Sequence, residues 1–150
     1  MLGDVIATEP IEPAIPVGAV FENAIELVGY DVSPTPAKRG EEVTVTFWWR
    51  SRAPVPDDWM VFVHLDDETR TVGRVIADHF PAMGRFRTPA WREGDVIRDE
   101  WRFSAPQGEI DGLALWTGFY RGETRLKVSS AGRGLRDGVN RVRAGVLSLE

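Results

Sequence analysis

The clearest indication of the fold is the stretch Val43-Thr44-Val45-Thr46-Phe47-Trp48-Trp49-Arg50. Large apolar residues recur at every second position from Val43, so one face of the segment is apolar throughout. A period of two is that of a β-strand, whose successive side chains point to opposite faces of a sheet. Residues 60–65, Met-Val-Phe-Val-His-Leu, repeat the pattern after a proline-containing turn. Two such runs, rich in β-branched and aromatic residues, predict an all-β domain.

Strand patterns and turn signals alternate along the rest of the chain. Strands are expected over residues 24–32, 42–52, 59–65, 71–77, 95–104, 112–120 and 139–149, with a short one at 124–128. The longest irregular stretch runs from His79 to Gly94, and no amphipathic helical segment interrupts the series. Seven or eight short strands with frequent turns predict one antiparallel β-sandwich, either Ig-like or jelly-roll in topology.

The inward faces of the expected strands supply a predicted core. Its members are Leu27, Val43, Val45, Phe47, Val61, Val63, Val96, Trp101, Leu113, Leu115, Val142 and Val146. Adjacent Trp48 and Trp49 must face opposite ways, and the register with Val43 places Trp49 inside and Trp48 outside.

Residues 1–18 are predicted to be extended, ahead of a single sandwich domain at residues 19–150. Pro10, Pro13 and Pro16 stand at every third position, and each proline fixes φ and biases its predecessor toward extended geometry. This segment is either a spacer that holds the domain away from another body or an edge segment lying along the sandwich.

Composition excludes several classes of function. The 150 residues carry a net charge of −5, which argues against nucleic-acid binding because that activity needs a basic face. There are no cysteines, and so no disulfides or thiolate metal ligands. No apolar run is long enough to insert into a membrane, and Met1-Leu2-Gly3-Asp4 lacks the basic start of a signal peptide.

A family resemblance covers roughly Phe21 to Leu126. The matching pieces are Ile25-Glu26-Leu27-Val28-Gly29-Tyr30, Trp48-Trp49-Arg50, Val61-Phe62-Val63-His64-Leu65, Asp78-His79-Phe80-Pro81-Ala82-Met83-Gly84, Thr88-Pro89-Ala90-Trp91-Arg92-Glu93-Gly94-Asp95 and Gly118-Phe119-Tyr120. In order and spacing they resemble the all-β accessory domain found C-terminal to the membrane part of some bacterial dolichyl-phosphate-mannose mannosyltransferase-like glycosyltransferases. The resemblance implies an extracytoplasmic sandwich, in the periplasm or at the cell surface, without catalytic residues. It also implies a membrane-embedded remainder of a parent protein as partner, and it supplies no binding residues.

Five residues are candidates for ligand binding. Outward-facing Trp48 could stack on a sugar ring, or a loop could cover it. Trp91, within the long loop, could form a platform for a glycan or other cell-surface polymer with Arg85, Arg87 and Arg92. Alternatively, Trp91 closes the open end of the sandwich and anchors the loop.

Catalytic and metal signals are weak. His64 and His79 lack the spacing of metal ligands, and His64, between two apolar strand residues, is expected to be a structural hydrogen-bonding residue. Asp99 and Glu100 should point to opposite faces of their strand, which prevents them from acting together as a carboxylate pair. No metal, cofactor or catalytic residue is therefore predicted.

Three hypotheses follow. The first is a noncatalytic accessory domain of a larger membrane-associated or cell-surface protein that binds carbohydrate. The second is a protein-interaction or assembly module without a glycan ligand. The third, a small hydrolase, would need a deep cleft with perturbed acidic groups.

Overall fold

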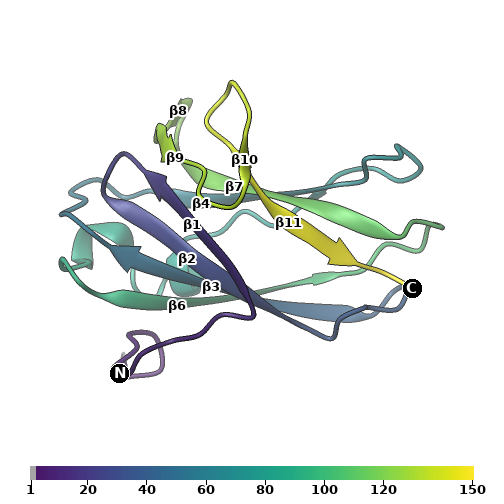
Figure 1. Cartoon of the computed structure of the whole chain (residues 1–150), viewed down its shortest axis with the longest axis horizontal. Helices are drawn as coiled ribbons and strands as arrows, with labels where there is room; N and C mark the ends of the chain where they lie inside the picture. The colour runs from purple at the N-terminus through teal and green to yellow at the C-terminus, as the bar shows by residue number, and fades with distance from the viewer. Residues whose placement is uncertain (1–2) are drawn as a thin grey trace.

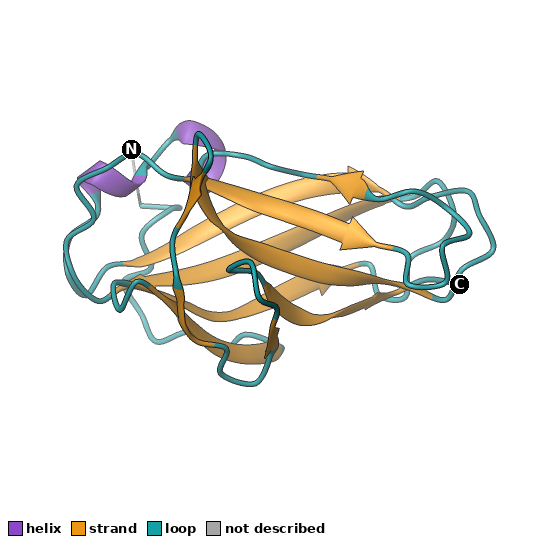
Figure 2. Ribbon diagram, turned by 90° about the horizontal axis from the view of Figure 1, so that it is seen from above, coloured by secondary structure: helices purple, strands orange, loops and turns teal. Residues whose placement is uncertain are grey.

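The computed structural model describes residues 3–150, which form two packed sheets (Figure 1). Seven strands have seven residues or more: β1 (Ile15–Phe21), β2 (Ile25–Ser33), β3 (Glu42–Ser51), β4 (Met60–Asp66), β6 (Val96–Ser104), β7 (Gly112–Arg121) and β11 (Val142–Ser148). Shorter strands are β5 (Val75–Ile76), β8 (Thr124–Arg125), β9 (Val128–Ser130) and β10 (Leu135–Arg136). The two helical turns, η1 (Pro81–Gly84) and η2 (Thr88–Ala90), lie at one end (Figure 2), and neither is long or apolar enough to cross a membrane.

The predicted antiparallel β-sandwich is confirmed. The first sheet has the order β6-β3-β2-β1-β9, and the second has the order β10-β11-β7-β4-β5 with β8 paired to β7. Every pairing between these strands is antiparallel. The side chains of residues 43–50 alternate between the core and the outer face of the sheet. Phe47 and Trp49 are fully buried between the sheets, and Trp48 is partly exposed on the outer face.

Strand β1 was not predicted, because Pro16 and Gly18 interrupt its alternation. It starts at Ile15, so the sandwich already includes residues assigned to the extended segment of residues 1–18. The register with β2 shifts between Pro16 and Ala19, where Gly18 has a φ of +74°. Residues 1 and 2 of the predicted segment lie outside the described range. The boundary between residues 18 and 19 stays a prediction.

The core is an aromatic cluster between the sheets. Phe47 makes edge-to-face contacts with Trp49, Trp101 and Tyr30, at centroid separations of 5.4, 5.3 and 6.4 Å. Trp49 also packs on Phe119 of the second sheet at 4.7 Å. Such pairs are worth about 0.5–1.5 kcal/mol each beyond the area they bury. The cluster therefore ties the two layers together.

Ten of the twelve predicted core residues are buried, and two are not. Val146 is 47% exposed, while its neighbour Leu147 is 3% exposed. The cause is a register shift in β11 between Arg143 and Gly145, which reverses the facing of all later residues. Val96 is only partly buried because it shares the outward face of β6 with Arg98, whereas its neighbour Ile97 faces the core.

Gly145 at this register shift predicts a measurable packing effect. A Cβ at this position would collide with the Tyr30 hydroxyl, which reaches across from the first sheet. We expect Gly145→Ala to lower the free energy of unfolding by about 1–3 kcal/mol, the usual cost of overpacking. The double variant with Tyr30→Phe should recover part of this loss in urea unfolding, because the colliding oxygen is gone. An equal loss of unfolding free energy in the single and double variants would show that the Tyr30 hydroxyl is not the group that clashes.

Candidate functional site

A buried ion pair joins the irregular stretch to β6. The Asp99 carboxylate is fully buried and accepts hydrogen bonds from Trp49 Nε1 at 3.0 Å and from the Ala82 backbone N–H at 2.9 Å. It also lies 2.8 Å from His79 Nε2, while His79 Nδ1 lies 2.8 Å from the Ala77 carbonyl oxygen. Both imidazole nitrogens face acceptors, so both carry protons and the ring is an imidazolium. With both nitrogens engaged, His79 is placed to anchor the loop.

The charge state of His79 predicts a pH dependence of stability. Burial disfavours the imidazolium, but the Asp99 charge and hydrogen bond outweigh it, and the pKa of His79 is raised above 6.5. The folded state thus holds this proton more tightly than the unfolded state. Its stabilisation is complete below pH 6.5 and is lost as the pH rises through the raised pKa.

We therefore expect urea unfolding to show declining stability from about pH 6.5 upward, in a window set by the histidine pKa. The other histidine, His64, has a lowered pKa, so its titration changes the free energy of unfolding only below about pH 6.5. His79→Gln should abolish the decline above pH 6.5. An unchanged slope in that variant would show that another group is responsible.

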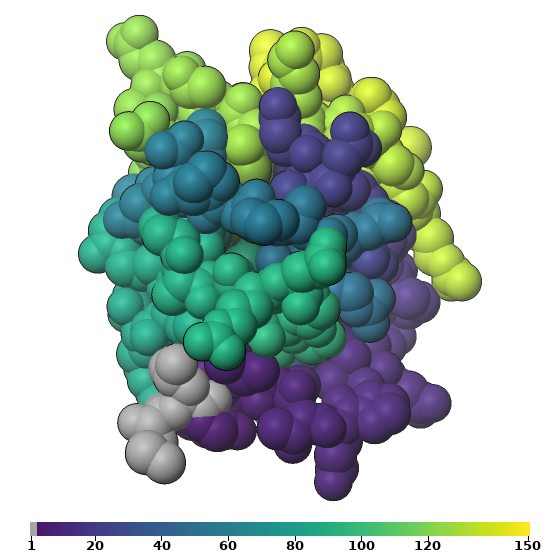
Figure 3. All heavy atoms as spheres, turned by 90° about the vertical axis from the view of Figure 1, so that its left-hand side faces the viewer, coloured from purple at the N-terminus to yellow at the C-terminus, as the bar shows by residue number. Residues whose placement is uncertain are grey.

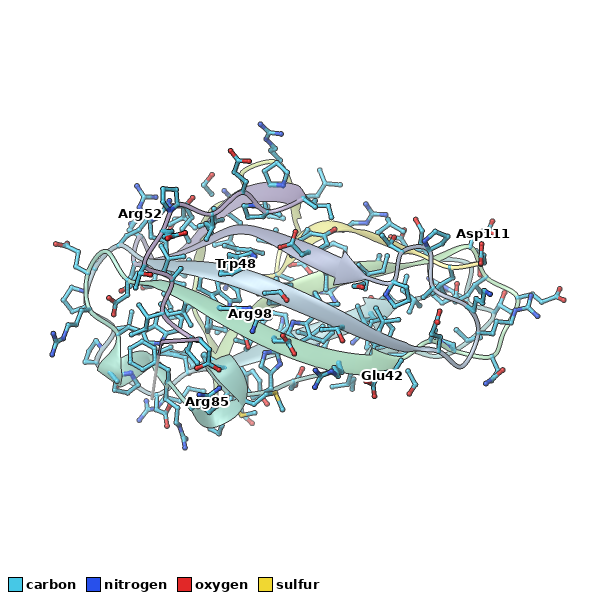
Figure 4. All side chains as sticks on the ribbon, turned by 90° about the horizontal axis from the view of Figure 1, so that it is seen from below. Glu42, Trp48, Arg52, Arg85, Arg98 and Asp111 are labelled. Atoms are coloured by element: carbon cyan, nitrogen blue, oxygen red, sulfur yellow. The ribbon has the colours of Figure 1, made fainter. Side chains whose placement is uncertain are left out.

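Trp48 lies where it was predicted, on the outer face of the first sheet (Figure 4). Its neighbour across the β3–β6 pair is Arg98, and its indole N–H donates to Asp31 Oδ2 at 2.9 Å. Asp31 Oδ1 accepts from the Ala14 backbone N–H at 2.7 Å, so the chain ahead of β1 is fastened beside the indole. The indole N–H of Trp48 is therefore already hydrogen-bonded within the chain.

The structure separates the other candidates. Trp91 is 4% exposed and donates from Nε1 to the Phe86 carbonyl at 2.8 Å, so the ring has no face free for a ligand and closes the loop. Arg85 pairs with Asp4 at 2.8 Å. Arg87 lies over the Phe80 ring at 3.6 Å.

Arg92 is exposed, and its backbone N–H donates to Asp95. Of the five candidates, Arg85 borders a hollow of about 220 Å³ together with Arg98, Glu100 and Arg102. Ligand binding by Trp48, Arg85, Arg87 and Arg92 stays a prediction.

A second set of outward residues lies on the opposite sheet. One residue from each of five adjacent strands forms a continuous row: Ile76, His64, Trp116, Arg143 and Leu135. Directly paired residues of antiparallel strands share a face, so all five point away from the core. The Arg141 guanidinium covers the Trp116 ring at 4.2 Å and lies 3.4 Å from His64 Nδ1. We call this surface the His64 face.

Beside this row is an open hollow of about 260 Å³. It is lined by Phe62, His64, Asp78, Tyr120, Gly122, Glu123 and Arg125. The Phe62 ring borders the hollow but is only 1% exposed, and it packs over Gly118, where a Cβ would come within 2.6 Å of the ring. The Arg125 guanidinium is 4.6 Å from the Phe62 ring and is held in place by the Val139 carbonyl at 2.8 Å. The hollow thus places two partly exposed rings, those of His64 and Tyr120, among polar side chains.

The electrostatics of the hollow favour neutral hydrogen-bonding groups beside a carboxylate. Burial lowers the pKa of His64, and nearby Arg74 and Arg141 lower it further, so the imidazole is neutral at physiological pH. Burial raises the pKa of Tyr120, and the charge and hydrogen bond of Asp78 add to this effect. Asp78 also accepts the Val63 backbone N–H at 2.8 Å, which fixes its orientation. The walls therefore offer both donors and acceptors in set positions.

Sequence reasoning missed the His64 face, although the sequence carried a signal for it. Placing Val61 and Val63 inside makes Phe62 and His64 outward, and placing Leu115 inside does the same for Trp116. Large aromatic residues at outward positions of two strands are a reason to suspect a site. What the sequence could not show is that β4 pairs with β7 in the register that brings His64 opposite Trp116.

Comparisons with known proteins establish the class of fold, a β-sandwich domain. No family model matches this sequence, and no curated protein matches it. The structure is similar to the crystal structure of the C-terminal domain of Wzt, with a TM-score of 0.54 over 93% of this chain and 82% of that one. Sequence identity is 12%, so the likeness shows the fold alone. The connection with glycosyltransferases stays a prediction.

Proposed function

We propose that this chain is a noncatalytic, carbohydrate-binding accessory domain and that the hollow above Phe62 holds a sugar residue. The observation that supports the proposal most strongly is the composition of the hollow: the partly exposed rings of His64 and Tyr120 beside Asp78 and Arg125. A sugar ring has an apolar C–H face that packs on aromatic carbon and a rim of hydroxyls. Carboxylates accept hydrogen bonds from those hydroxyls, and guanidinium groups donate to them.

The arrangement of the acidic groups supports binding without chemistry. Asp78 is occupied by the Val63 N–H and by Tyr120, so it serves to orient hydroxyls. The buried Asp99 is enclosed by Trp49, His79 and Ala82. We place the domain in a larger membrane-associated or cell-surface protein, on the extracytoplasmic side, on the basis of the sequence resemblance to the glycosyltransferase accessory domain.

The test is isothermal titration with a broad panel of bacterial cell-surface glycans. At least one glycan should bind, and His64→Ala should weaken it about tenfold or more, since removing one polar contact from a bound ligand costs about 1.4 kcal/mol or more. Trp48→Ala is the matched control on the other sheet and should leave affinity unchanged. Loss of binding in Trp48→Ala with none in His64→Ala would move the site to the first sheet.

A protein-interaction module is the second candidate, and a specific observation favours it. Exposed aliphatic side chains lie on the His64 face and beside it: Ile76, Leu135, Val139 and Val146 are between 47% and 64% exposed. Exposed apolar groups gathered on one face are typical of a docking surface. Absence of binding to every glycan of the panel would favour this candidate.

A further inference from the structure

The first sheet does not end at β6, because residues 5–7 add a short strand to its free edge. Ile6 pairs with Ile97, the Ala7 backbone N–H donates to the Val96 carbonyl at 2.8 Å, and the Arg98 N–H donates to the Val5 carbonyl at 2.6 Å. Val5 is 3% exposed, and Asp4 forms an exposed ion pair with Arg85. Figure 3 shows these early residues along the lower border of the molecule, next to the loop that contains Arg85.

The chain then has to cross the outer side of the sheet. Strand β1 lies three positions away from β6, beyond β3 and β2, and the next described anchor is the Ala14 N–H on Asp31. Residues 8–14 make this crossing, and most of them are exposed. Seven residues span roughly 25 Å when extended, whereas the four strand spacings of about 4.8 Å from residues 5–7 to β1 amount to roughly 19 Å. The connection therefore has slack, and Pro10 and Pro13 keep it extended.

We propose that the edge of β6 is a strand-acceptor site and that its occupant, besides the chain's own segment, is residues 4–7 of a second copy of this chain. An edge strand presents unpaired backbone groups that accept any matching extended segment. The segment that matches best is already present in every copy, with Val5 in its buried position and Asp4 opposite Arg85. Exchange of an element joined by an extended connection gives a closed two-fold dimer without new contacts.

Contacts are the same in the closed monomer and the exchanged dimer, so concentration decides between them. By mass action, a tenfold rise in free monomer raises the ratio of dimer to monomer about tenfold. This inference is independent of any sugar binding on the His64 face, which lies on the other sheet.

The absence of cysteines allows a direct test in the full chain. Ile6 and Ile97 form a pair without mutual hydrogen bonds, a geometry in which side chains approach closely enough for a disulfide. Ile6→Cys/Ile97→Cys protein is prepared in two batches of different mass, mixed reduced at increasing concentration, and oxidised. Mass spectrometry then shows whether position 6 is linked to position 97 of the same or the other batch.

The proposal predicts cross-batch links between positions 6 and 97 whose share rises with concentration and exceeds the dimer formed by Ile6→Cys alone. Exclusively internal links at every concentration would overturn it. Ile97 is fully buried, so a second pair, Asp4→Cys/Arg85→Cys on the exposed ion pair, repeats the test in a protein whose core is untouched, with a short bis-maleimide as the link because the long arginine side chain separates the two backbones too far for a disulfide. The same outcomes decide there.

Discussion

Replacing Asp99 with alanine is expected to lower the free energy of unfolding by about 3–5 kcal/mol, the usual effect of removing one partner from a buried ion pair. The Asp99 carboxylate satisfies the His79 imidazolium, the Trp49 indole and the Ala82 N–H at once. Without it, three buried donors lose their acceptor in a region that water does not reach. The loop that begins at His79 should then detach from β6.

The matched control is Glu100→Ala, one position along the same strand. Glu100 points outward and accepts hydrogen bonds from Arg98 and, at 2.8 Å, from Arg102, surface interactions worth about 0–1 kcal/mol each. Urea unfolding followed by far-UV circular dichroism measures both variants without relying on Trp49 fluorescence, which the first substitution disturbs. Equal, small losses in the two variants would show that Asp99 is not the buried anchor.

Replacing Phe47 with alanine should cost about 3–5 kcal/mol as well, through loss of buried area and creation of a cavity. Phe47 is fully buried and contacts three aromatic rings, one on its own strand and one on each neighbouring strand: Trp49, Trp101 and Tyr30. The cavity cannot close easily, because strands β2 and β6 fix the backbone on either side of β3.

Thr44→Ala, on the outward face of the same strand, is the control and should change stability by no more than about 0.5 kcal/mol. Thermal unfolding of the two variants provides the comparison. A midpoint for Phe47→Ala that matches the parent chain would mean that Phe47 does not face the core.

The sandwich could be predicted from the sequence because its long central strands alternate regularly. Val43, Val45 and Phe47 lie on one face of the strand with no polar residue among them, and this period of two determines which face is buried. The prediction fails where the backbone breaks that period. The register shift before Gly145 turns Val146 outward, and Gly18 with its positive φ lies within a strand that was not recognised.

The candidate site was less predictable, because it depends on pairings between distant segments. Trp48 and Trp91 were chosen for their residue type, yet Trp91 is held inside by a hydrogen bond to Phe86 within its own loop. His64 and Trp116 are 52 positions apart, and only the β4–β7 register places them opposite each other. Likewise, the contact of His79 with Asp99 depends on how an irregular loop folds back onto β6.

The most direct test of sugar binding on the His64 face uses the six indole N–H signals as probes. In a ¹H–¹⁵N spectrum of the labelled chain, a binding glycan should shift the Trp116 indole together with backbone amides of β4 and β7, and leave the Trp48 indole in place. Shifts confined to Trp48, β3 and β6 during saturable binding would contradict the assignment.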